Sequence, residues 1–135
     1  MTTATLHRPS KAVASSSLPS VSIFMTTSFI GFHQWETAPE AVKYLRSLHR
    51  HVFHIRLEIS VYHNDRELEY HMVLGAMNKF IDSEMLGAMW NNRWSCEDIA
   101  FKIVLWAADA YPGRPVYAVT VSEDDENGSR VELKA

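Results

Sequence analysis

The chain has 135 residues, 47% of them hydrophobic, and a formal net charge of −3. This length suits one domain that can bury its own core. The negative net charge argues against a nucleic-acid-binding surface. No apolar run reaches the ~18–20 residues of a membrane span. A single cysteine excludes an internal disulfide. We therefore expect a soluble protein of a reducing compartment, the cytoplasm, without nucleic-acid or membrane partners.

Residues 1–20 are rich in Ser, Thr and Ala and contain no acidic residue. We interpret them as a flexible N-terminal arm that precedes a single domain over residues 21–135. A Ser-rich, acid-free start that contains Arg and Lys is also typical of organelle transit peptides, so that alternative stays open.

Two long strands are predicted in the first half of the chain, over residues 21–34 and 50–62. Both stretches are rich in β-branched and aromatic residues, and the second alternates between two faces with a period of two. A short helix is expected between them, over residues 36–47. After the second strand, residues 63–66 are expected to form a turn and residues 67–70 a short return strand.

A helix is predicted over residues 71–81, because its apolar residues form one stripe at helical spacing. Residues 82–94 are expected to form an irregular connection. This connection is unusually rich in large apolar residues, namely Met85, Leu86, Met89, Trp90 and Trp94. We therefore expect it to be buried at an interface, for example against another subunit.

A second helix is predicted to begin at Ser95, where a Ser-x-x-Asp sequence resembles a capping box. A Tyr-Pro-Gly sequence is expected to end it. Strands are predicted over residues 115–122 and 129–134, joined by a hairpin loop over residues 124–128 in which Asn127-Gly128 is the turn signal. The element order β, β, α, α, β, β predicts an α+β fold.

The second predicted strand contains a His-x-His sequence. His49 and His51 are two residues apart, so both imidazoles project from the same side of a strand. Neutral imidazoles are common zinc ligands. A third histidine, His33, ends the first strand, and a carboxylate, Glu123, ends the third. The alternative is a partly exposed pair of strand histidines that binds no metal.

Four motifs support a resemblance to a known family. Residues 29–33 read Phe-Ile-Gly-Phe-His, residues 48–53 read Leu-His-Arg-His-Val-Phe, residues 94–100 read Trp-Ser-Cys-Glu-Asp-Ile-Ala, and residues 119–124 read Val-Thr-Val-Ser-Glu-Asp. In order and spacing they resemble the motifs of the 6-pyruvoyltetrahydropterin synthase / 6-carboxytetrahydropterin synthase family. The resemblance covers about residues 22–134. It implies a T-fold, a four-stranded antiparallel sheet with two helices packed on one face.

The resemblance implies that His33, His49 and His51 hold a zinc ion. Three protein ligands leave a fourth position open, which is typical of catalytic zinc sites. In the family, the metal holds the hydroxyl or keto oxygens of a pterin side chain and makes neighbouring C–H bonds more acidic. The alternative is a divergent copy whose histidines pack in the core without metal.

Three further residues correspond to the family's substrate pocket. Glu123 matches the glutamate that accepts hydrogen bonds from the N–H edge of the pterin, and two carboxylate oxygens suit such paired donors. Glu97 and Ser95 are expected near the same pocket. As alternatives, Glu123 is an exposed turn carboxylate, and Glu97 is a first-turn residue favoured by the helix dipole.

The proton-transfer residues depart from the family pattern. Leu45 stands where the family has a cysteine, four residues before the His-x-His sequence. The family's Asp-His pair has its best counterpart in Asp82 and Ser83, so Asp82 is the candidate catalytic residue and the histidine is missing. His54 and His71 are candidate substitutes, with a surface or packing role as the alternative.

Cys96, the one thiol, lies beside the start of the second helix. A helix N-terminus can lower a thiol pKa. Because Cys96 is not at the position of the family cysteine, we expect it to be buried and unreactive.

Three functions are consistent with these expectations. The first is a zinc-dependent carbon–oxygen lyase of the tetrahydropterin synthase type, acting on 7,8-dihydroneopterin triphosphate or a related pterin with an altered acid/base set. The second is a catalytically inactive homolog that binds metal and a pterin or purine, and the third is an oligomeric scaffold without metal. The family joins its unpaired sheet edges between subunits, so a homo-oligomer is expected, a hexamer made of two trimers.

Overall fold

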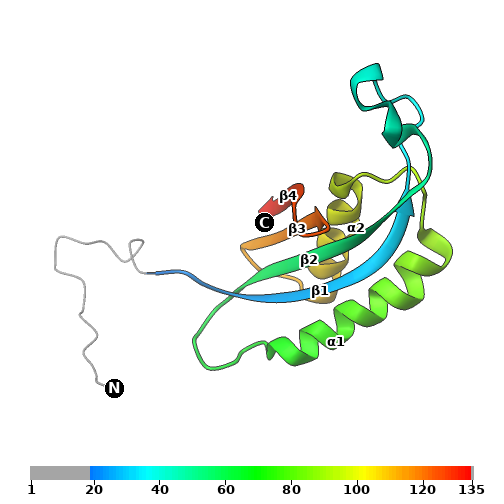
Figure 1. Ribbon diagram of the computed structural model, residues 1–135. Coiled ribbons are helices and arrows are strands. Elements are labelled where there is room, and N and C mark those ends of the chain that lie inside the picture. Colours follow the sequence, from blue (N-terminus) through cyan, green and yellow to red (C-terminus); the bar gives the residue numbers. More distant parts are fainter. Residues whose placement is uncertain (1–18, 135) are drawn as a thin grey trace, which may run out of the picture.

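The computed structural model describes residues 19–134 (Figure 1). Residues 1–18, most of the segment interpreted as an arm or transit peptide, lie outside this range. The elements in chain order are β1 (Val21–His33), the 3₁₀ helix η2 (Glu40–Arg46), β2 (His49–Val61), α1 (Tyr70–Phe80), the π-helical segment η3 (Ile81–Met89), α2 (Cys96–Ala110), β3 (Val116–Glu123) and β4 (Asn127–Lys134).

The four strands form one open antiparallel sheet in the order β1-β2-β3-β4. The register pairs His33 at the end of β1 with His49 at the start of β2, and Glu123 at the end of β3 with Phe53. The predicted α+β class and the four-stranded antiparallel sheet are confirmed, and the arrangement is compatible with a T-fold. One end of the sheet therefore gathers three histidines and a glutamate.

Both long helices cover the same face of the sheet. α1 packs against β1, and α2 packs against β3 and β4 (Figure 1). Alternate strand residues point toward the helices and are almost completely buried, including Phe53, Ile55, Leu57, Ile59, Val119 and Val121. Burying such a side chain contributes about 1.5–3 kcal/mol. The period of two in the sequence thus fixes which face of each strand enters the core.

The start of α2 follows the sequence prediction. Ser95 is the N-cap, its hydroxyl accepts a hydrogen bond from the backbone N–H of Asp98, and the Asp98 carboxylate accepts one from the backbone N–H of Ser95. This reciprocal capping box satisfies two backbone donors that have no partner within the helix. It also fixes where Ser95 and its neighbours stand relative to the end of the sheet.

The segments that flank β2 bear out one prediction and contradict another. The short helix predicted over residues 36–47 forms as the 3₁₀ helix η2, which is kinked at Val42 and buries none of its residues. The return strand expected over residues 67–70 does not form, because the Glu69 carboxylate caps α1 and Tyr70 already begins that helix. A local cap outweighed the β propensity of a short segment.

Two predictions in the second half of the chain also need correction. The connection expected to be irregular over residues 82–94 is π-helical as far as Met89, and Met85 is fully buried in the core of its own chain. The hairpin loop predicted over residues 124–128 is shorter than expected, because its turn signal, Asn127-Gly128, belongs to β4. The turn instead uses Asp124 and Asp125, which have φ angles of 54° and 60°.

Candidate metal centre

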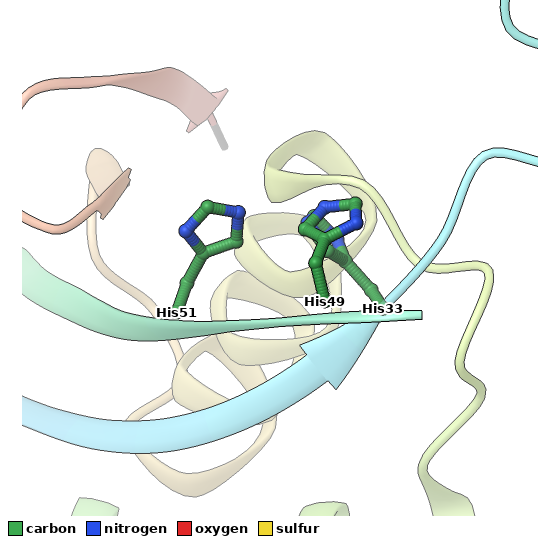
Figure 2. Close-up of side chains that lie close together, drawn as sticks. All are labelled: His33, His49 and His51. Atoms are coloured by element: carbon green, nitrogen blue, oxygen red, sulfur yellow. The ribbon is translucent and has the colours of Figure 1, made fainter. Parts of the chain in front are cut away.

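Three imidazoles converge at the end of the sheet where β1 finishes and β2 begins. His33, His49 and His51 project from the same side of the two strands (Figure 2). One candidate ligand atom of each ring lies within 4.8 Å of those of the other two. The antiparallel pairing of β1 with β2 therefore converts a His-x-His sequence and a distant histidine into one cluster.

The hydrogen bonds of the three rings decide which nitrogen faces the cluster. Each Nδ1 lies 2.7–2.8 Å from an oxygen that can only accept a hydrogen bond: His33 from the carbonyl of Trp94, His49 from the carbonyl of Ser47, and His51 from the carboxylate of Asp124. Each Nδ1 must therefore carry the proton. In the neutral rings, all three Nε2 atoms are left with a free lone pair, the form that binds metal.

The carboxylate of Glu123 faces two of these nitrogens. Its Oε2 lies 3.1 Å from Nε2 of His33, and its Oε1 lies 3.6 Å from Nε2 of His51. The Nε2 atom of His51 is buried and has no hydrogen-bond partner among the described residues. A carboxylate oxygen and an imidazole lone pair repel each other unless a cation, either a proton or a metal ion, lies between them. The arrangement thus calls for a positive charge at its centre.

The donor set fits a metal ion. Three imidazoles with free Nε2 atoms suit zinc, and they also suit copper, iron and nickel. The hydrogen bonds at Nδ1 supply the outer contacts that orient ligating histidines in metalloproteins. His33, His49 and His51 could therefore hold a metal ion.

Asp124, which holds His51, is itself anchored to β2 by two further hydrogen bonds. Its backbone N–H donates to the carbonyl of Val52 at 2.7 Å, and its carboxylate accepts from the Val52 N–H at 2.9 Å and from His51 at 2.7 Å. These hydrogen bonds lower the pKa of the Asp124 carboxyl below its usual value. Asp124 also has a positive φ, a conformation that aspartate tolerates better than most residues.

Asp124 was not among the site residues predicted from the sequence. The available signal was its place directly after the last residue of β3, on the strand that pairs with β2. The family motif has threonine at this position, so the resemblance assigns no role to Asp124.

A cavity of about 520 Å³ adjoins the histidine cluster. His33 and His49 line it, and so do the three residues that the sequence assigned to substrate binding, Glu123, Glu97 and Ser95. Leu45, Trp35 and Trp94 add apolar surface. The cavity therefore places carboxylates and aromatic rings beside the candidate metal position.

The other candidates for proton transfer lie elsewhere. Asp82 is exposed in η3 and does not line this cavity. His54 projects from the opposite face of β2 to His51, and His71 is exposed at the start of α1, where it contacts Glu69. A catalytic role for Asp82 stays a prediction, and neither histidine is placed to substitute for the missing one within this cavity.

Cys96 is buried at the start of α2 and lines the cavity. Burial, with a smaller contribution from the negative charge of Glu123, raises the pKa of its thiol to about 12.

The thiol is therefore expected to resist iodoacetamide at neutral pH. With its pKa about three units above the ordinary value, the thiolate fraction falls roughly a thousandfold, and alkylation slows with it. Mass spectrometry after timed alkylation of native and urea-unfolded protein would measure the difference. Equal rates in the two states would contradict this prediction.

No protein family matches the chain, and no curated protein matches its sequence. The resemblance to the tetrahydropterin synthases therefore rests on its four sequence motifs. In the part of the chain that the structure describes, no helix is both long and apolar enough to cross a membrane.

Proposed function

We propose that the protein is a zinc-dependent, pterin-handling carbon–oxygen lyase that resembles the 6-pyruvoyl- and 6-carboxytetrahydropterin synthases. The convergence of three imidazoles, each with its Nδ1 bonded to an acceptor oxygen, carries this proposal. His33, His49 and His51 would hold the zinc. When bound, zinc supplies a Lewis acid that polarises substrate oxygens and makes adjacent C–H bonds more acidic.

The proposed substrate is 7,8-dihydroneopterin triphosphate or a related pterin. A cavity of about 520 Å³ falls within the usual range for small-molecule sites. The carboxylates of Glu123 and Glu97 can accept hydrogen bonds from the N–H groups of a pterin. Trp35 and Trp94 offer aromatic surface for its flat ring.

A second candidate function is a homolog that binds metal and a pterin or purine without turnover. Leu45 favours it, because this cavity-lining residue stands where the family has its ionisable cysteine and can neither accept nor donate a proton. Asp82 does not line the cavity, so a role for it in the proposed reaction requires a second subunit or a movement of η3.

We also propose that the chain forms a homo-oligomer, a hexamer of two trimers, in the cytoplasm. Two observations support assembly. β1 and β4 are the outer strands of an open sheet, and edge strands need cover. On the helix-free face, the β1 residues Phe24, Ile30 and Phe32 are 47–55% exposed. The buried free thiol of Cys96 suits a reducing compartment.

Metal analysis of freshly purified full-length protein tests the metal centre. We expect about one zinc per chain. The double substitution His49→Ala/His51→Ala should abolish zinc binding, whereas His54→Ala, on the opposite face of the same strand, should leave it unchanged. Absence of bound metal, even after zinc is supplied, would refute the proposal and leave only the fold.

Turnover separates the two candidate functions. The zinc-loaded protein would be incubated with 7,8-dihydroneopterin triphosphate, and the products followed by chromatography. Conversion that disappears in His49→Ala supports the lyase. Saturable binding of the pterin without conversion supports the inactive homolog instead.

A further inference from the structure

Glu123 occupies a position that pterin recognition alone does not explain. It is the last residue of β3 and lies on the helix-covered face, in the alternating row that includes Val119 and Val121. Its side chain consequently points toward the same end of the sheet as His33 and His51. Both of its oxygens face the metal-binding nitrogens of these rings, at 3.1 and 3.6 Å.

These separations match those between two ligands of one metal ion. In a tetrahedral site with bonds of 2.0–2.1 Å, neighbouring ligand atoms lie about 3.3–3.4 Å apart. The two distances from Glu123 to His33 and His51 lie on either side of this value. A hydrogen bond donated by a neutral ring to the Glu123 carboxylate does not explain them, because the single proton of each ring is committed to Nδ1.

Glu123 and Glu97 are the two carboxylates that line the cavity beside the histidines. Glu97 lines the same cavity but makes no ion pair with the three histidines within residues 19–134. Of the two carboxylates, only that of Glu123 lies at ligand spacing.

We infer that Glu123 is a fourth ligand of the metal ion, and that it closes the coordination position which a substrate oxygen would use. This inference rests on the metal centre of the proposed function. It adds a gate to that centre, since an incoming ligand must displace Glu123. The carboxylate released in this way becomes free to accept hydrogen bonds from N–H groups of the same ligand.

Azide binding to the cobalt(II)-substituted full chain tests the gate, because a small anion occupies an open metal position and changes the visible absorption of cobalt. In the wild type, azide must compete with Glu123. In Glu123→Gln and Glu123→Ala, the dissociation constant of azide should fall at least about tenfold, and the affinity for the metal should fall by about tenfold or more. Glu126→Gln, the same charge change in the adjacent turn, should match the wild type in both measurements.

Each outcome has a distinct meaning. If the wild type binds cobalt and already binds azide as tightly as both Glu123 variants, with the same spectrum, Glu123 is not a ligand and the metal centre stands. If the wild type takes up no cobalt, the metal centre fails, and the fourth ligand fails with it. The two Glu123 variants must give the same result in both measurements, because a local distortion caused by one substituted side chain would not be reproduced by the other.

Discussion

Replacing Asp124 with asparagine is expected to weaken zinc binding by about 10–100-fold. The carboxylate of Asp124 accepts the Nδ1 proton of His51 and also a hydrogen bond from the N–H of Val52. In Asp124→Asn, the amide oxygen can keep the bond to Val52, and the amide NH₂ then faces His51. A donor at this place favours the tautomer of His51 that carries its proton on Nε2, and that nitrogen can no longer bind a metal.

Two measurements check this prediction. Competition with a chromophoric chelator gives the zinc affinity of each variant, and ¹⁵N NMR of the metal-free protein reports which nitrogen of His51 carries the proton. Asp125→Asn is the matched control, because Asp125 lies in the same turn, also has a positive φ of 60°, and does not contact His51. An unchanged affinity and tautomer in Asp124→Asn would show that Asp124 does not position His51.

The histidine cluster could be predicted from the sequence because it follows from strand periodicity. A period of two places His49 and His51 on one side of β2. The pairing of β1 with β2 then brings His33 directly opposite His49. Nothing local in the sequence shows this pairing. The four family-like motifs supplied it, and the sheet order in the structure agrees with it.

The part of the site formed by the β3–β4 turn could not be predicted in the same way. Asn127-Gly128 is a strong local turn signal, yet both residues lie in β4. Asp124 makes hydrogen bonds to β2 through its backbone and its side chain, and these long-range contacts fix the turn at Asp124 and Asp125. Propensity rules consider only neighbouring residues, so they miss a turn that is set by a strand more than 70 residues away.

The segment after α1 shows a second limit of sequence reasoning. The large apolar residues of residues 82–94 indicated burial, which holds for Met85 but not for Met89, 41% of which is exposed. Met85 is buried in the core of its own chain, and Trp90 and Trp94 pack against that core. Both the core of one chain and a subunit interface bury apolar side chains, so composition alone cannot distinguish them.

Replacing Phe53 with alanine is expected to lower the free energy of unfolding by about 3–5 kcal/mol. Phe53 is completely buried, and its ring stacks on that of Phe29 with the centroids 5.4 Å apart. The imidazoles of His33 and His51 stand edge-on to the same ring, at 5.2 and 5.8 Å. Loss of the ring would leave a cavity directly under two of the three metal-binding side chains, so zinc affinity should fall as well.

Urea denaturation of the metal-free protein measures the change in the free energy of unfolding without a contribution from bound metal. Phe101→Ala, the same change at a site on α2 that is 52% exposed, is the control and should alter stability by no more than about 0.5 kcal/mol. Phe53→Leu should lose less stability than Phe53→Ala, because it fills more of the space. A Phe53→Ala protein that is destabilised but binds zinc as tightly as the wild type would show that the position of the imidazoles does not depend on the Phe53 ring.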